Sequence, residues 1–394
     1  MKSKGRIAKV ATLLISACFA AARNSKGRIK QSAISDTFEQ NPEDLLDLTG
    51  TPWILVSEFP GDALRDETGQ LSLFNTRNTH LVPLTKLKTA TVGGHDNVLS
   101  PLADPTCEPR SLDSISPHGI AGYNNGDGTW EIAVVNHFAY ESIEFYTLDF
   151  NADSEDSEGD TRIRPLLQSA GCVIFQEGDV HNNLAYNSDK SILAVTLWFD
   201  KYFGPLGQAN VGQIVASSLF FNKNKGDGQV KLIRKKGRVK TISEGLLAPN
   251  GIRWSRDDQV LFVAESPINS KQSSILAIDP KTGRSSIAFQ VDGLPDNIGS
   301  DDTPSEQQDD VFLVTVAPFS KDQFVCSLAF LPDTGACDNL EFSVVRYNYS
   351  KDQTTQLYTS RMNGQASIAM IKNGVGYTGS YNRQDLVTVR GFAA

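Results

Sequence analysis

Side chains that can bind a metal recur along this 394-residue chain, each shortly before an apolar segment. Most carry a carboxylate, a carboxamide or an imidazole, whereas an ordinary polar face would also include lysine, serine and threonine. Oxygen ligands from neutral and anionic groups suit a hard cation, and calcium accepts their number and irregular geometry better than magnesium does. In chain order the positions are Glu43 with Asp44, His118, Asn182 with Asn183, Asn250, and Asp296 with Asn297. These residues predict a calcium site, provided that the fold brings them together.

The candidate ligands belong to a pattern that occurs six times: a polar anchor, a turn or loop, and a short apolar strand. The strands start 51 to 79 residues apart, which suits a four-stranded propeller blade better than a helical repeat. Asn125-Gly126-Asp127-Gly128 and Gly226-Asp227-Gly228 are typical of hairpin turns. The anchors and their strands are 42–45 with 53–57, 117–120 with 132–137, 181–184 with 192–196, 249–252 with 260–265, 295–298 with 311–315, and 365–368 with 375–379.

The element pattern therefore predicts an all-β protein, a six-bladed β-propeller over residues 38–394 with a central calcium site. No stretch of ten or more residues after position 40 shows helical amphipathicity. We expect the ring to close by pairing a strand from one end of the chain with strands from the other, with 386–389 as a candidate, since closure removes the free sheet edge. Equivalent residues of successive blades would then meet at the central channel.

Composition excludes several classes of protein. Hydrophobic residues make up 40% of the chain, enough for a sizeable core, so a disordered or collagen-like chain is excluded. The net charge of −9 argues against nucleic acid or an anionic membrane as the main partner. No apolar run approaches the roughly 20 residues of a membrane-spanning helix. The sequence does not determine the oligomeric state.

The amino terminus predicts export. Residues 1–22 combine a basic start with an uncharged stretch and small residues at its end, which is typical of a secretory signal. Residues 15–18 also resemble a lipobox, which would place a lipid anchor on Cys18. We expect residues 23–37 to form a linker and the protein to be secreted or extracytoplasmic.

The remaining cysteines are Cys107, Cys172, Cys326 and Cys337, and none forms a Cys-x-x-Cys pair, so no zinc ribbon or thioredoxin-like site is supported. Cys326 and Cys337 are close in sequence and could bridge a hairpin in an oxidising compartment.

At the anchors the chain resembles the serum paraoxonase/arylesterase family of calcium-dependent lactonases. The most specific segments are Pro117-His118-Gly119-Ile120 and Val134-Val135-Asn136-His137, which place two histidines 19 residues apart. The resemblance implies that His118 is a general base and that His137 orients it. It implies a catalytic calcium on Glu43, Asn182, Asn250, Asp296 and Asn297, and a second, structural calcium on Asp44, the Ile120 carbonyl and Asn183.

The chain also departs from that family. Asn183 stands where the family usually has Asp, and Lys201 replaces a histidine in the segment Asp200-Lys201-Tyr202 on the pocket wall. Ala317 takes the place of a pocket histidine, and the family's long-range disulfide has no expected counterpart. These differences bear on the substrate range more than on the chemistry.

We therefore expect a calcium-dependent hydrolase of lactones or aryl esters with a small-molecule substrate. The chain contains no Gly-x-Ser-x-Gly elbow that would supply a serine nucleophile. One alternative is a sugar-lactonase or a strictosidine-synthase-like enzyme, because residues 248–252 and 261–265 are shared with those propellers, although His137 argues against the gluconolactonase type. The other alternative is a non-catalytic binding propeller stabilised by calcium.

Overall fold

The structure is a computed structural model that describes residues 30–34, 38–60, 68–84, 99–151, 165–176, 178–199, 226–267, 270–303, 310–318, 340–361, 366–381 and 383–391. Residues 1–22 with Cys18, the pocket candidates Asp200 and Lys201, and the cysteines Cys326 and Cys337 lie outside these ranges. Within the ranges, no helix is long and apolar enough to cross a bilayer. The described strands form six four-stranded antiparallel sheets, which we number as blades in chain order.

Blade 1 consists of β2 (Asn41–Asp47), β3 (Trp53–Phe59), β4 (Gln70–Asn75) and β5 (Leu81–Pro83). A short 3-10 turn, η3 (Leu112–Ser114), precedes blade 2, which consists of β6 (Pro117–Asn124), β7 (Thr129–Asn136), β8 (Ser142–Asp149) and β9 (Leu166–Ile174). Blade 3 consists of β10 (Val180–Tyr186), β11 (Ile192–Phe199), β12 (Gly228–Arg234) and β13 (Arg238–Leu246).

Blade 4 consists of β14 (Pro249–Trp254), β15 (Leu261–Glu265), β16 (Gln272–Ile278) and β17 (Ser285–Asp292). Blade 5 consists of β18 (Leu294–Ser300), β19 (Val311–Ala317), β20 (Phe342–Asn348) and β21 (Gln353–Ser360). Blade 6 consists of β22 (Ala366–Lys372), β23 (Val375–Ser380), β24 (Leu386–Arg390) and β1 (Lys30–Ile34).

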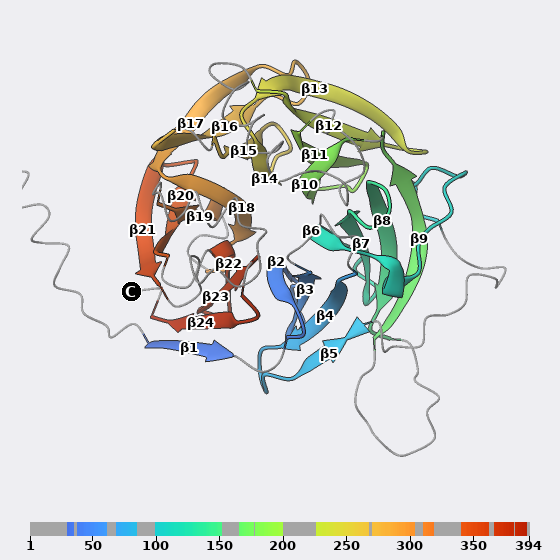
Figure 1. The fold of residues 1–394 in the computed structure, drawn as a ribbon, viewed down its shortest axis with the longest axis horizontal. Coiled ribbons are helices and arrows are strands. Elements are labelled where there is room, and N and C mark those ends of the chain that lie inside the picture. The colour runs from blue at the N-terminus through green and yellow to red at the C-terminus, as the bar shows by residue number, and fades with distance from the viewer. Residues whose placement is uncertain are drawn as a thin grey trace, which may run out of the picture.

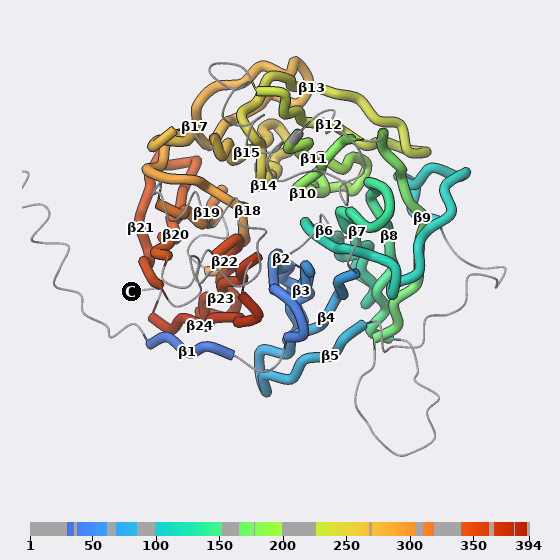
Figure 2. Tube along the Cα trace, in the orientation of Figure 1, coloured from blue at the N-terminus to red at the C-terminus, as the bar shows by residue number. Residues whose placement is uncertain are grey.

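The six sheets surround a common axis, with the first strand of each blade innermost (Figure 1). This arrangement confirms the predicted all-β, six-bladed propeller. The ring closes where β1 pairs with β24 from Lys30 opposite Arg390 to Ile34 opposite Leu386, and Figure 2 shows the two ends of the chain side by side there. The closing strand at 386–389 is therefore confirmed. The expected linker at 23–37 is wrong in part, because residues 30–34 fill the free edge of blade 6 and belong to the sheet.

Each predicted apolar strand is the second strand of its blade, and each anchor lies inside the innermost strand, not in a loop before it. All six innermost strands shift register at the anchor, for example between Pro117 and Ile120 in β6 and between Pro295 and Ile298 in β18. A β-bulge of this kind bends the strand and re-aims its side chains. The bulges therefore turn the anchors toward the axis.

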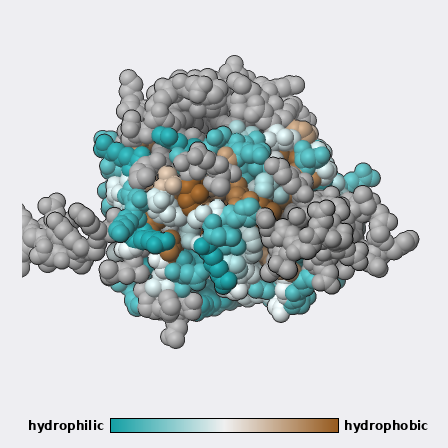
Figure 3. Space-filling view, turned by 90° about the horizontal axis from the view of Figure 1, so that it is seen from below, coloured by the Kyte–Doolittle hydropathy of each residue, from teal (hydrophilic) through white to brown (hydrophobic). Residues whose placement is uncertain are grey.

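The hydrophobic core is divided into six clusters, one between each pair of neighbouring blades. Between blades 6 and 1, for example, Ile368 and Leu386 pack with Leu45 and Ile54. Burial between sheets is the main stabilising contribution in such a ring, since each blade is apolar on both faces. The surface in Figure 3, seen from the lower edge of Figure 1, is mostly hydrophilic with a small apolar area, as the net charge leads one to expect.

Glycines allow the inner strands to approach one another. A Cβ on Gly119 would lie 2.5 Å from the carbonyl oxygen of Asn182 in the next blade, and one on Gly251 would lie 2.5 Å from the amide nitrogen of Ile298.

The hairpin predicted at Asn125–Gly128 joins β6 and β7, but the one predicted at Gly226-Asp227-Gly228 is wrong. Gly228 opens β12, and a Cβ there would lie 2.2 Å from a side-chain carbon of Pro249, so the glycine serves close packing.

One disulfide was not expected from the sequence. Cys107, in the loop before β6, is bonded to Cys172 on β9, which is fully buried. The bond closes a loop with a sequence separation of 65 residues. It links the loop before β6, the inner strand of blade 2, with β9, the outer strand of the same blade.

We predict that the double variant Cys107→Ser/Cys172→Ser is less stable than the wild type by about 3–4 kcal/mol under oxidising conditions, because the long loop gains freedom in the unfolded chain. Urea denaturation with and without reductant measures this difference. The variant should also lose most of the wild type's sensitivity to reductant. Equal stability of the two proteins without reductant would contradict the prediction.

Candidate functional site

The anchors gather at one end of the central channel, near the starts of the innermost strands. Hydroxyl groups connect neighbouring blades there. Thr196 on β11 donates from Oγ1 to the carbonyl of Asn250 in blade 4 (2.7 Å), and Ser367 on β22 donates from Oγ to the carbonyl of Glu43 in blade 1 (2.5 Å). Blade 6 therefore adds no ligand candidate of its own, but it fixes the strand that carries Glu43.

Three carboxylates meet in this buried end of the channel. Glu43 and Asp44 are 1% and 3% exposed, and Asp296 lies in the same group. Burial, with the charge of Glu43, raises the pKa of Asp44 from 3.8 to about 8. The same two causes raise the pKa of Asp296 well above its usual value. His118 is the only basic side chain among the groups that act on these two pKa values, so the site has an excess of negative charge.

Three of the expected ligands present free oxygens. Glu43 Oε2, Asn182 Oδ1 and Asn250 Oδ1 are buried and have no hydrogen-bond partner among the residues that the structure describes. The amide of Asn250 is hydrogen-bonded to the Asp296 carboxylate, which leaves the Asn250 oxygen as a free acceptor. Unpaired buried oxygens are costly, and these come from inner strands of blades 1, 3 and 4. Their chemistry fits a hard cation.

The candidate ligands offer both carboxylate and amide oxygens, and this combination narrows the choice of metal. Among the described residues, no group of three or more His, Cys, Asp and Glu side chains is arranged to hold a metal ion. A metal at the anchors would therefore need the amide oxygens of the asparagines. Amide and carboxylate oxygens together suit calcium or magnesium better than zinc or copper.

Asn297 differs from the other expected ligands because both ends of its amide are engaged. Its Nδ2 donates to Glu43 Oε1 (3.1 Å), and its Oδ1 accepts from Asn183 Nδ2 (2.7 Å). Asn297 is fully buried, so these bonds hold Glu43 from the side. In this arrangement Asn297 positions Glu43 and offers no free oxygen.

The expected second calcium site does not fit the structure. Asp44 Oδ1 accepts from the Leu45 amide (2.9 Å), and Oδ2 accepts from the Ile120 amide (2.9 Å) and from Asn183 Nδ2 (3.2 Å). The Asn183 nitrogen thus points at the carboxylate where a second ion would have to bind. An aspartate at position 183 would offer an oxygen instead, which is the physical reason why the substitution matters.

The two histidines are in direct contact. His118 Nδ1 lies 2.8 Å from His137 Nε2, and the His118 ring stacks on Phe59 with ring centroids 4.9 Å apart. His118 Nε2 lies 3.3 Å from Glu43 Oε1. Burial lowers the pKa of His118, but the charges of Glu43, Asp296 and Asp44 outweigh burial, so its pKa is raised. The pair therefore connects directly to the carboxylate cluster.

Two further residues extend this contact, and the sequence analysis missed them. Glu141, in the turn between β7 and β8, has Oε2 at 2.8 Å from His137 Nδ1 and Oε1 at 3.1 Å from His181 Nδ1. Burial alone would raise the pKa of Glu141, yet the two histidines lower it to about 2. Burial lowers the pKa of His181. The spacing of His137 and Glu141, four residues apart, was the only available signal.

Ala317 lies at the end of β19, opposite Leu294 in the ladder, and is 2% exposed. The structure therefore shows a buried strand end at this position. Asp200 and Lys201, which we expected on the pocket wall, lie outside the described residues.

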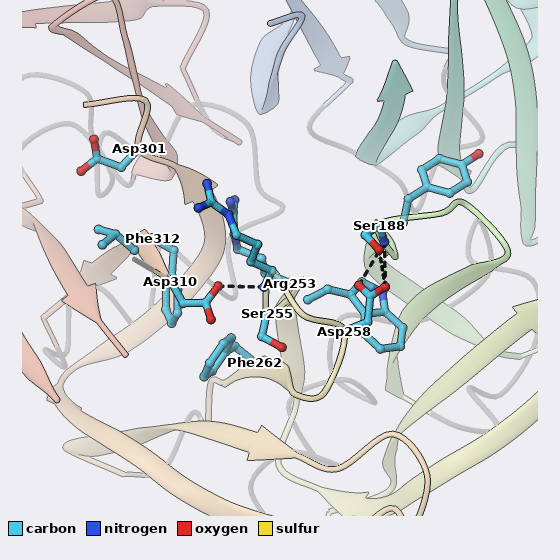
Figure 4. A pocket seen from close by; sticks show the side chains of 12 residues that line it. Ser188, Arg253, Ser255, Asp258, Phe262, Asp301, Asp310 and Phe312 are labelled. Atoms are coloured by element: carbon cyan, nitrogen blue, oxygen red, sulfur yellow. Dashed lines mark hydrogen bonds between the residues drawn. The ribbon is translucent and has the colours of Figure 1, made fainter. Parts of the chain in front are cut away.

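A pocket of about 310 Å³ lies at the opposite ends of the inner strands, next to Arg253 and Tyr186 (Figure 4). Its acids are already bonded: Asp258 accepts from the amide and hydroxyl of Ser188, and Asp310 accepts from the amide of Arg256. None of the predicted site residues lines it. We therefore place the candidate site at the anchor end of the channel, where the unpaired oxygens and the histidines are.

Residues 202–303 match the family model described as the SMP-30/gluconolactonase/LRE-like region. The matched segment carries Asn250, Asp296 and Asn297. The match covers this segment only, and the comparisons do not show the paraoxonase family that the histidine segments resemble. No curated protein matches the chain.

Distant solved structures share the fold. A luciferin-regenerating enzyme is similar with 10% identity, 92% of this chain and 95% of that chain covered, and a TM-score of 0.50. A gluconolactonase from Xanthomonas campestris is similar with 12% identity, 92% and 90% covered, and a TM-score of 0.51. At these identities the likeness extends to the fold alone.

We predict that the chelator-treated protein becomes less stable as the pH rises from about 4 to about 8. Asp44 has a pKa of about 8 in the folded protein against 3.8 in an unfolded chain, so the stabilisation from its proton is fully present at low pH and is lost as the pH rises through 8. Thermal unfolding in EDTA at a series of pH values measures the slope. The variant Asp44→Asn should show a shallower slope than the wild type, and equal slopes would count against the assignment.

Proposed function

We propose that this protein is a calcium-dependent hydrolase of lactones. The observation that carries the proposal is the set of unpaired buried oxygens on Glu43, Asn182 and Asn250, next to the histidine pair. These oxygens and Asp296 would hold one calcium ion, which neutralises the excess negative charge of the cluster. His118 lies beside the same cluster and can serve as a base.

The chemistry follows from these positions. When bound, calcium would polarise the lactone carbonyl and stabilise the oxyanion that forms on it. His118 takes a proton from water, whose oxygen bonds to the carbonyl carbon. The ring C–O bond then breaks, and the proton passes to the departing alkoxide. The product is a hydroxy acid, so no covalent enzyme intermediate, oxidant or reductant is needed.

The nature of the lactone is the finer part of the proposal. The family model that matches residues 202–303 favours a sugar lactone, the substrate class of gluconolactonases. The contact between His118 and His137 supports the paraoxonase-type reading, with lipophilic lactones or aryl esters. We give the sugar lactone at least equal weight, since only that reading is supported by a family match.

The contacts of Asp44 support a single calcium ion. Its oxygens accept from three nitrogen donors, those of Leu45, Ile120 and Asn183. The side-chain amide of Asn183 directs an N–H group at the Asp44 carboxylate. This N–H group supplies part of the electrostatic stabilisation that a second ion would give.

Export remains part of the proposal. A disulfide between Cys107 and Cys172 persists in an oxidising compartment, which agrees with the signal-like residues 1–22. A lipid on Cys18 would keep the exported protein at a membrane surface.

The activity is tested with glucono-δ-lactone, δ-valerolactone, γ-decalactone, dihydrocoumarin and phenyl acetate, each with calcium and then with EDTA. We expect turnover that disappears with EDTA and returns with calcium. Turnover confined to gluconolactone would identify the sugar-lactonase reading, whereas turnover of dihydrocoumarin or phenyl acetate would identify the paraoxonase-type reading.

The variant His118→Gln should lower lactone turnover by about 100-fold or more, because it removes the base. Calcium binding, measured by calorimetry, should stay close to that of the wild type. Unchanged turnover would overturn the role of His118. Loss of thermal stability on chelation without turnover of any substrate would identify a binding propeller instead.

The number of ions is tested by Asn183→Asp. The wild type should bind one calcium per chain in calorimetry, and the variant should bind two, because the new carboxylate replaces the N–H that faces Asp44. The variant should also be less stable than the wild type in EDTA, since two carboxylates then face each other without an ion. Two ions on the wild type would refute the single-ion assignment.

A further inference from the structure

Glu141 joins two histidines from different blades. Its Oε2 accepts from His137 Nδ1 at 2.8 Å, and its Oε1 lies 3.1 Å from His181 Nδ1. The backbone amide of His181 also donates to Oε1, at 2.5 Å. All three side chains are buried, with exposed fractions of 6%, 5% and 0% for Glu141, His137 and His181.

These contacts determine which ring nitrogens carry protons. An ionised carboxylate only accepts hydrogen bonds, so His137 and His181 must each present a proton on Nδ1. When His137 carries a single proton, on Nδ1, its Nε2 is bare and accepts from the Nδ1 of His118. A proton on His118 Nδ1 leaves the lone pair on Nε2, 3.3 Å from Glu43 Oε1, and this arrangement is favourable when a cation is bound at Glu43, as in the calcium-loaded protein proposed above.

The surroundings of His181 are consistent with a proton on its Nδ1. Its Nδ1 lies 3.1 Å from Glu141 Oε1, which requires the proton there, and no described residue provides an acceptor for a proton on the buried Nε2. Its ring packs against Phe175, with centroids 3.9 Å apart. His181 therefore fixes Glu141 from β10, one residue before the ligand candidate Asn182.

We propose that Glu141 is a positioning residue that sets the tautomers of His137 and His118, so that the basic nitrogen of His118 faces the carboxylate cluster. The catalytic consequence rests on the proposed function, but the tautomer assignment does not. Glu141 itself touches neither Glu43 nor the free oxygens in any described contact, so it acts through the two histidines.

The variant Glu141→Gln tests the assignment with almost no change in shape. The backbone N–H of His181 needs an acceptor, so the glutamine oxygen takes the place of Oε1 and its NH₂ group faces His137. His137 must then accept at Nδ1 and carry its proton on Nε2. His137 and His118 then both take the other tautomer. The proton of His118 moves to Nε2, the nitrogen that has to act as a base.

We expect Glu141→Gln to lower kcat for the best lactone by about 100-fold or more, with KM and calcium stoichiometry unchanged. The matched control is Glu144→Gln. Glu144 is also fully buried and accepts from the Ser142 hydroxyl (2.7 Å) and the Arg110 amide (3.2 Å), with no histidine in contact. Its kcat should stay within about threefold of the wild type. Equal kcat values for Glu141→Gln and the wild type would overturn the proposal.

A second measurement needs neither activity nor a folded variant. The chain has five histidines, so ¹⁵N-labelled imidazoles can be assigned one by one in the calcium-loaded wild type. We expect His118, His137 and His181 to carry protons on Nδ1 and to have a bare Nε2. A proton on His118 Nε2 with a bare Nδ1 would refute the tautomer assignment. Lack of turnover on every lactone, with the expected tautomers, would refute only the proposed function.

Discussion

The β-bulge near the start of every innermost strand is the constraint on which the central site depends. A regular strand alternates its side chains between two faces, and in a propeller both faces are covered by neighbouring blades. Only a break in that alternation lets consecutive residues such as Glu43 and Asp44, or Asn182 and Asn183, leave the interblade core. The shifts in register at these residues therefore create the channel end as a functional surface.

The same arrangement has an electrostatic cost. Glu43, Asp44 and Asp296 are brought together in a region of low dielectric, where their mutual repulsion is strong. Part of that repulsion is offset by N–H donors, as at Asp44, and part by His118. The remaining unpaired oxygens still need donors or a cation, and the proposed calcium ion would meet this need at the centre of the fold.

Sequence reasoning found the blades because each anchor is followed by a β-branched strand at a regular distance. It assigned no strand to the anchors themselves, because proline and glycine in Pro117-His118-Gly119 and Pro249-Asn250-Gly251 look like turn residues when the next blade is not visible. It missed Glu141, because the contact of this carboxylate with His181 cannot be seen in the sequence. His181 is 40 residues away and belongs to another blade. It missed the Cys107–Cys172 bond because it considered only the pair that is close in sequence, Cys326 and Cys337, although that pair leaves Cys107 and Cys172 for each other.

The closure of the ring has a consequence for the order of folding. Lys30, one of the first residues of the propeller to be synthesised, pairs with Arg390, one of the last. Blade 6 cannot be completed before the ribosome has released nearly the whole chain, and until then the free edge of β24 or β1 can pair with another molecule. The proposed calcium ligands come from four of the blades, so a growing chain acquires them gradually and its circular shape only at the end. A carrier that shields β1 during synthesis would therefore protect this protein from such pairing.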